Sequence, residues 1–139
     1  MNFVDAIKSV YSNYANFNGR ACRSEFWWFT LFNFIMSIIM GLTPVTDLIW
    51  SLGNLLPSLA VACRRLHDIE RSGWWQLLPL AGVPIVLLGF SAEFFLYIGG
   101  IVVIGLVILL IVWYATKGTD GPNRFGDDPL GGIDADVFT

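Results

Sequence analysis

Residues 94–116 read FFLYIGGIVVIGLVILLIVWYAT, and this stretch decides the class of fold. Fifteen of its residues are Leu, Ile, Val or Phe, and none is charged. At about −0.3 to −0.6 kcal/mol for each such residue, the apolar side chains favour bilayer insertion by about −5 to −9 kcal/mol before polar offsets. The length also lies within the ~17–25 residues that an α-helix needs to cross the hydrocarbon core. The stretch therefore predicts a transmembrane helix.

The rest of the chain has the same apolar character. Of the 139 residues, 55% are hydrophobic and 14% are charged, and the mean hydropathy is +0.65. Soluble domains carry about a quarter charged residues, so this composition excludes an ordinary soluble domain. Three further stretches lack Asp, Glu, Lys, Arg and His. Membrane spans are predicted at about 26–43, 48–63, 74–90 and 94–116.

Two of these spans are weaker candidates than the others. Residues 48–63 are few for a span and include Ser51, Asn54 and Pro57, and residues 74–90 contain Gln76 and two prolines. A re-entrant hairpin or a buried pair of helices is the alternative for both.

The distribution of basic residues favours four full spans. With four spans, the N-terminal arm, the 64–73 loop and the C-terminal segment share one side of the membrane, and the turns near 43–47 and 91–93 face the other. All eight basic residues then lie on the first side: Lys8, Arg20, Arg23, Arg64, Arg65, Arg71, Lys117 and Arg124. Because positive charge is retained in the cytoplasm, both termini are predicted to be cytoplasmic.

The N-terminal arm has an amphipathic pattern. Phe3, Ile7, Val10 and Tyr14 recur at helical spacing. Such a helix either lies on the inner leaflet or packs on the protein's own cytoplasmic side. We expect an all-α integral membrane protein: a four-transmembrane-helix bundle with an N-terminal amphipathic helix and a charged cytoplasmic cap. Residues 1–130 would form one domain, and 131–139 an acidic, disordered tail.

Three polar motifs fall on the predicted cytoplasmic side. They read FNGRACRSEFWW (17–28), RRLHDIERSGWW (64–75) and DGPNRFGDDP (120–129). Their order and spacing resemble the bacterial membrane-protein family called domain of unknown function 805, and the likeness covers about residues 10–130. The resemblance implies a small bacterial inner-membrane protein and implies no activity. The long apolar region 74–116 and the acidic tail depart from shorter members of that family.

The charged cap is the main candidate site. A network of its side chains would tie the arm, the loop and the tail together, since Arg65 and Asp68 are three apart and Arg64 and Asp68 four apart on a helix. Arginine forks also match phosphate oxygens, so the cap is equally a candidate site for anionic lipid or a protein partner. Its residues are Arg20, Arg23, Glu25, Arg64, Arg65, His67, Asp68, Asn123, Arg124 and Asp128.

Catalysis and metal binding have weaker support. His67 and Asp68 resemble an acid–base pair, but adjacent residues on a helix point about 100° apart. No recognised catalytic motif accompanies them. Cys63 and His67 at i, i+4, with Cys22, would be a sparse metal set. We therefore expect no catalytic residue, metal, cofactor or nucleic-acid partner.

A polar seam crosses the first two predicted spans. Asn33 and Ser37 on one span face Asn54 and Ser58 on the other at similar depth. Such residues usually make interhelical hydrogen bonds, and the alternative is a path for a solute.

The leading function is a non-enzymatic binding, scaffold or regulatory subunit in the inner membrane. Its partners would be membrane lipids and a protein partner or a second copy. The alternative is a small-solute channel or transporter that uses the seam, and an enzyme that uses His67 is a third class.

Overall fold

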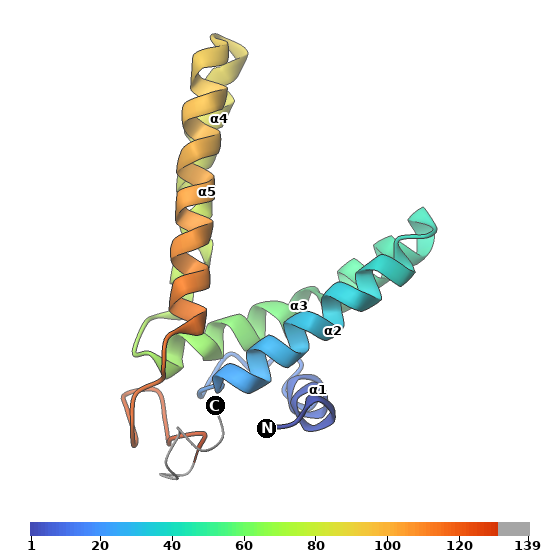
Figure 1. Ribbon diagram of the computed structural model, residues 1–139, viewed down its shortest axis with the longest axis vertical. Helices are drawn as coiled ribbons and strands as arrows, with labels where there is room; N and C mark the ends of the chain where they lie inside the picture. The colour runs from blue at the N-terminus through green and yellow to red at the C-terminus, as the bar shows by residue number, and fades with distance from the viewer. Residues whose placement is uncertain (131–139) are drawn as a thin grey trace.

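The computed structural model describes residues 1–130 and is all-α, as predicted. Two helical hairpins and a short N-terminal helix make up the described chain (Figure 1). Its only β-type pairing is an isolated bridge between Asn123 and Gly126. The predicted acidic tail, 131–139, lies outside the described residues.

The N-terminal helix α1, Phe3–Ser12, packs against the first hairpin. Asn2 caps it, because its side-chain oxygen accepts a hydrogen bond of 2.8 Å from the Asp5 amide. Ala6 and Val10 are fully buried, and Val10 belongs to a small core with residues of α2 and α3. The helix therefore packs part of its apolar face against the protein's own helices, while Phe3 and Tyr14 of the predicted apolar pattern stay exposed.

The first hairpin pairs α2, Arg23–Met40, with α3, Pro44–Asp68. Thr43 caps α3, which stays helical through the buried Pro57. The helix runs beyond the predicted 48–63 and includes the first five residues, RRLHD, of the second polar motif. That extension places Arg64, Arg65, His67 and Asp68 on a rigid element.

The second hairpin is irregular on its first arm. Residues 74–90 were expected to form one span, and the chain here is the 3₁₀-helix η1, Gly73–Gly82, followed by α4, Val83–Leu87, and a 3₁₀ turn η2, Leu88–Phe90. Pro79 lies inside η1 and lacks the N–H that an α-helix would use there, whereas Pro84 lies in the first turn of α4, where proline is tolerated. The second arm is the regular helix α5, Glu93–Ala115.

Glycine allows the two arms of this hairpin to approach closely. A Cβ at Gly99 would lie 2.7 Å from the Val86 backbone nitrogen. A Cβ at Gly82 would lie 2.6 Å from a methyl group of Val103. Small residues bring helix backbones together in the same way in membranes.

Within residues 1–130, three helical segments are long and apolar enough to cross a membrane: Pro44–Asp68, Gly73–Phe90 and Glu93–Ala115. Helix α2 is not among them, since its 18 residues begin with a turn that carries Arg23 and Glu25. The predicted count of four spans is therefore not confirmed.

The two hairpins diverge from a common base instead of lying side by side (Figure 1). At the base, α3 contacts both η1 and α5, and the Arg23 side chain reaches the Ala115 carbonyl at 3.4 Å. The turns near 41–43 and 91–92 lie at the far tips, well apart. The predicted four-helix bundle is not confirmed, because the hairpins meet only at this end. Polar contacts join them there, and Tyr114 of α5 packs on Phe26 of the small core with 4.5 Å between the ring centroids.

Candidate functional site: a polar hub

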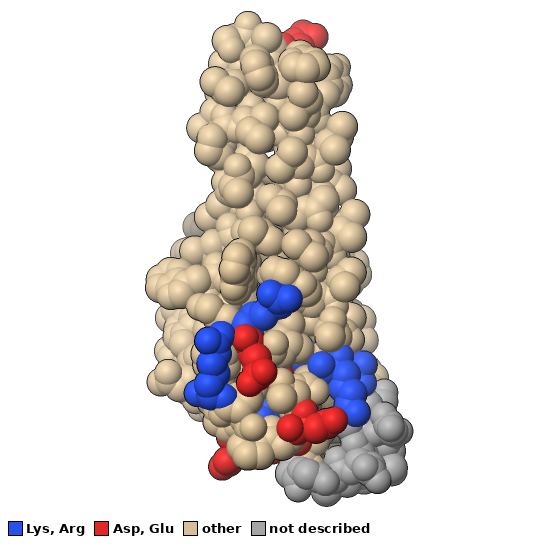
Figure 2. Space-filling model, turned by 90° about the vertical axis from the view of Figure 1, so that its left-hand side faces the viewer, with Lys and Arg blue, Asp and Glu red and all other residues tan. Residues whose placement is uncertain are grey.

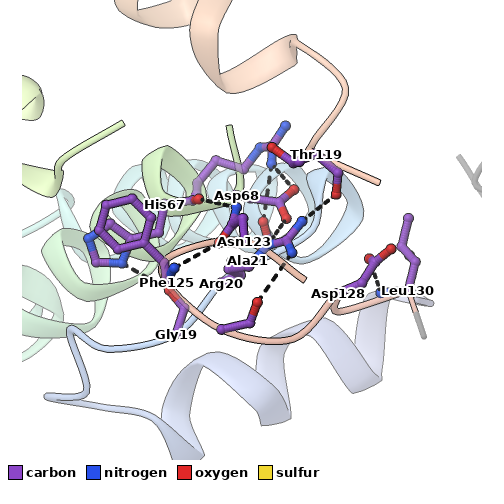
Figure 3. A network of polar contacts seen from close by, with 12 residues as sticks. Gly19, Arg20, Ala21, His67, Asp68, Thr119, Asn123, Phe125, Asp128 and Leu130 are labelled. Atoms are coloured by element: carbon purple, nitrogen blue, oxygen red, sulfur yellow. Dashed lines mark hydrogen bonds and ion pairs between the residues drawn. The ribbon is translucent and has the colours of Figure 1, made fainter. Parts of the chain in front are cut away.

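Asp68 lies at the centre of a buried cluster of polar contacts (Figure 3). One carboxylate oxygen accepts a hydrogen bond of 2.9 Å from Arg20, and the other accepts one from Arg65. The relative exposure of these side chains is 6%, 1% and 0% respectively. We call Arg20, Arg65, His67, Asp68 and Asn123 the polar hub. The pairing of Arg65 with Asp68 follows the predicted i, i+3 spacing.

Arg20 connects the N-terminal arm to the C-terminal segment. Beyond Asp68, its guanidinium donates to the Thr119 carbonyl at 2.5 Å and the Gly121 carbonyl at 2.6 Å. The Thr119 amide in turn donates to the Asp68 carbonyl at 2.8 Å. Gly118 has to be small, because a Cβ there would lie 2.0 Å from an Asp68 carboxylate oxygen.

Arg65 ties α3 to the end of α5. Its guanidinium donates to the Tyr114 carbonyl at 2.9 Å and to the Thr116 carbonyl, and to Ala21 in the arm at 3.2 Å. The last carbonyls of a helix lack intrahelical partners and attract cations. A fully buried arginine thus satisfies the C-terminal end of α5 and holds the second hairpin on the first.

His67 is oriented by backbone and by an aromatic ring, not by Asp68. Its Nδ1 lies 2.9 Å from the Gly19 carbonyl oxygen. The Phe125 ring stacks on the imidazole at 4.0 Å between centroids, with an angle of 2° between planes. The Asn123 side chain donates to the His67 carbonyl at 3.0 Å. This arrangement does not form the acid–base pair that the sequence suggested.

The chain after α5 folds into a small loop that closes over the hub. Asn123 and Gly126 exchange backbone hydrogen bonds of 3.0 and 3.1 Å, and Gly126 has a φ of +139° that favours glycine. Asp128 accepts a bond of 3.0 Å from the Gly121 amide. The third sequence motif therefore encodes a loop that presents Asn123 and Phe125 to α3.

A backbone turn terminates helix α3. The amides of Glu70 and Arg71 donate to the carbonyls of His67 and Leu66 at 3.0 and 2.9 Å, the pattern of a Schellman C-cap. Glu70 adopts the left-handed φ of 59° that this turn requires. Its carbonyl accepts a bond of 2.9 Å from the exposed Arg124.

Arg64 and Glu25 form a second buried pair, separate from the hub. Arg64 Nη1 donates to Glu25 Oε1 at 3.0 Å, and the Ser9 hydroxyl of α1 donates to the same oxygen at 2.8 Å. Arg64 therefore does not pair with Asp68, although the i, i+4 spacing permits it. Two of its guanidinium nitrogens, Nε and Nη2, are buried without a partner among the described residues.

Other charged side chains face outward around the hub. Arg71 lies over the Trp113 ring at 4.0 Å, and Lys117 and Asp120 form an exposed pair at 3.5 Å. Arg23 is half-buried and Arg124 is exposed. Figure 2 shows basic and acidic side chains gathered at this end of the molecule, below a long uncharged surface.

The polar seam is partly assembled, with partners that were not foreseen. The Trp50 indole donates to Asn33 at 3.0 Å, and the Tyr11 hydroxyl of α1 donates to Asn54 at 2.5 Å. Burial raises the pKa of Tyr11. Ser37 and Ser58 are half-buried and take no part in these bonds.

The sparse metal set suggested by the sequence, Cys22, Cys63 and His67, is not assembled in the described part of the chain. Cys22 and Cys63 are buried and free. Within residues 1–130, no group of three or more His, Cys, Asp or Glu side chains is arranged to hold a metal ion.

Sequence reasoning missed the contributions of backbone carbonyls and of small or aromatic residues. Gly118, Thr119 and Phe125 complete the hub, and Ser9 and Tyr11 fix α1. The helical spacing of Arg65 and Asp68 predicted that these two side chains could pair. Contacts between side chains and backbone carbonyls leave no pattern in the sequence from which they could be predicted.

Comparisons with known proteins agree with the motif resemblance. A family model described as "Protein of unknown function (DUF805)" matches residues 14–127. The chain is 41% identical over 129 residues to Inner membrane protein YhaI of Escherichia coli strain K12, covering 87% of this chain and 92% of that protein. It is 35% identical over 138 residues to Inner membrane protein YhaH of the same strain, covering 91% and 97%. No solved structure matches the chain.

Proposed function

This chain belongs to the DUF805 family of unknown function and is similar to inner-membrane proteins, and we propose that it is a non-enzymatic membrane scaffold or regulatory subunit. Its charged cytoplasmic end would engage anionic lipid or a protein partner. The observation that carries the proposal is the hub: its charged groups bind one another and backbone carbonyls, which stabilises an arrangement of helices.

A topology of four spans with cytoplasmic termini is part of this proposal. The hub joins the start of α2, the end of α3 and the end of α5, so both hairpins leave from one level and return to it. The tips carry no basic residue. Both features support an even number of crossings, with the basic side in the cytoplasm.

Cysteine labelling tests the topology. The background is a chain in which Cys22→Ser and Cys63→Ser remove both native thiols. In right-side-out inner-membrane vesicles, Thr43→Cys at the first tip should react with an impermeant maleimide added to the outside. Thr119→Cys should react only after the membrane is opened. Labelling of Thr43→Cys from the cytoplasmic side alone would overturn the four-span proposal.

A structural role explains the chemistry of the hub better than catalysis. Asp68 is occupied by two arginines, and His67 is held by the Gly19 carbonyl under the Phe125 ring. In a His–Asp acid–base pair the carboxylate hydrogen-bonds the imidazole and orients it. The carboxylate nearest in sequence to the histidine instead neutralises buried guanidinium groups.

The surface that engages lipid would be formed by the outward basic residues. Arg20, Arg64 and Arg65 are predicted candidates for lipid contact, but the relative exposure of their side chains is 1%, 4% and 0%. Arg23 and Arg124 are more exposed. Arg23 donates to the Ala115 carbonyl at the end of α5, and Arg124 lies over the Phe125 ring at 4.6 Å. A basic residue near an anionic leaflet contributes about 1 kcal/mol of attraction.

Lipid retention tests this surface. Removing two charges, Arg23→Gln with Arg124→Gln, should weaken retention of phosphatidylglycerol by about 30-fold, the ratio that corresponds to ~2 kcal/mol. Native mass spectrometry of protein released from nanodiscs would measure it, with phosphatidylcholine as the lipid control. Lys8→Gln on α1 is a control for loss of a basic charge away from the hub. Equal retention by the double variant and the parent would refute lipid binding at this surface.

A solute pathway is the second candidate function. A groove of about 440 Å³ opens beside the seam and is lined by Tyr11, Trp50, Gly53 and Asn54, among others. Asn54→Leu should then reduce solute flux in proteoliposomes. Absence of flux through the parent protein across a broad panel of small solutes would count against this function.

A further inference from the structure

A pocket of about 460 Å³ lies between the end of α3 and the start of η1. Phe17 of the N-terminal arm closes one side. Its volume falls within the roughly 300–1,000 Å³ of small-molecule sites. Of the hub residues, only His67 reaches it, so the pocket is separate from the buried ion pairs.

The walls of the pocket are apolar and uncharged. Leu59, Leu77 and Trp74 line it with Phe17, and none of its lining residues carries a formal charge when His67 is neutral. Trp74 is 79% exposed, so its indole is free to cover a bound molecule. An ion that entered would lose hydration without gaining a counter-charge. The lining therefore selects an uncharged ligand.

The polar groups of the pocket suit a hydroxyl group. A carbonyl oxygen only accepts hydrogen bonds, so the Gly19 carbonyl at 2.9 Å places the proton of a neutral His67 on Nδ1. The other nitrogen, Nε2, is then an acceptor, and it lies 3.5 Å from Cys63 Sγ. Gln76 offers both a donor and an acceptor, and the Ser72 oxygen accepts from the Trp74 amide at 3.4 Å while its own proton remains available.

We propose that this pocket binds an uncharged, hydroxyl-bearing amphiphile. Its hydroxyl group would donate to His67 Nε2 and exchange hydrogen bonds with Gln76, while its alkyl chain lies along Leu59 and Leu77. The ligand is a neutral membrane lipid whose glycerol group keeps a free hydroxyl, such as a monoacylglycerol or a diacylglycerol. This binding is independent of the anionic-lipid surface, because the two use different side chains.

The test uses three probes on the full-length protein in nanodiscs: monoolein, oleic acid and glycerol. Native mass spectrometry measures how much of each is retained on release. Monoolein should be retained as a single copy, and ionised oleic acid about tenfold less strongly. Glycerol has the hydroxyl groups but no alkyl chain, so it should not be retained, and retention of glycerol without monoolein would overturn the proposal. Loss of the monoolein preference over oleic acid would overturn the proposal.

A matched pair of variants locates the site. Leu77→Trp fills the pocket and should lower monoolein retention about tenfold. Leu80→Trp adds the same ring at an exposed position of η1 outside the pocket, and it should leave retention unchanged. Gln76→Leu keeps the size of the side chain, and it should lower retention of monoolein without changing the melting temperature. Equal retention by Leu77→Trp and Leu80→Trp would overturn the proposal.

Discussion

Replacing Asp68 with Asn tests whether buried charge holds the two hairpins together. The carboxylate neutralises Arg20 at 2.9 Å and also Arg65, and both guanidinium groups are almost completely buried. Asn keeps the shape and removes the charge, so two buried cations lose their counter-charge. Removing one partner of a buried pair costs about 3–5 kcal/mol. That is a large share of the roughly 5–15 kcal/mol by which folded proteins are stable.

The matched control is Asp120→Asn. Asp120 pairs with Lys117 at 3.5 Å, and the two side chains are 80% and 45% exposed. Exposed pairs contribute about 0–1 kcal/mol. Both substitutions change the net charge equally, so a difference between them reports burial and not overall charge.

Unfolding in detergent micelles, followed by tryptophan fluorescence, would measure the free energies of both variants. Limited trypsin digestion supplies a second measurement, because loss of the hub should expose the bonds after Lys117 and Arg124. We expect Asp68→Asn to be destabilised and readily cleaved, and Asp120→Asn to behave like the parent. Equal stability and equal cleavage of the two variants would refute the role assigned to the hub.

The remaining predictions concern packing and pH. Gly99→Ala should lower the free energy of unfolding by about 1–3 kcal/mol, because its Cβ would lie within 2.7 Å of Val86. Gly100→Ala has nothing within 4 Å of its Cβ, so it should be neutral or stabilising by up to ~1 kcal/mol. Thermal unfolding of the two variants compares these effects. Phe125→Ala removes a stacked ring worth about 0.5–1.5 kcal/mol, and hydrogen exchange should show faster opening of the 123–126 loop, with slow exchange retained in α3. Burial raises the pKa of Tyr11, so the folded state favours the neutral phenol. The contribution of Tyr11 to stability should be fully present below pH ~10 and should fall as the pH rises above that value. The Tyr11→Phe variant should lack this fall in stability at high pH.

The apolar helices could be predicted from the sequence because they depend on local composition. The prediction of a span at 94–116 coincides closely with α5, Glu93–Ala115. The segment after Gly73 was less predictable, because prolines and close contacts through Gly82 and Gly99 decide its 3₁₀ geometry. Nor could the sequence predict the divergence of the hairpins, since charge and hydropathy patterns say nothing about the angle between helices.

The candidate site was predictable only as a set of charged residues. Helical spacing predicted that Arg65 and Asp68 face one another, and the structure pairs them. The partner of Arg20 lies 48 residues away and that of Arg64 lies 39 residues away. Such distant pairs depend on how the chain folds back. The burial of these arginines also depends on the fold, and it moves any lipid-binding role to other basic residues.

Because the two hairpins are joined at one end only, a rotation at the hub displaces their far tips by a large distance. Helix α5 has 23 residues, and at about 1.5 Å per residue it is ~35 Å long. A rotation of about 5° at the hub would therefore displace the far tip by ~3 Å, on the order of half a helical turn. In the proposed four-span topology, small rearrangements around one carboxylate would thus be magnified at the opposite face of the bilayer, and changes in bilayer thickness would in turn displace the hub.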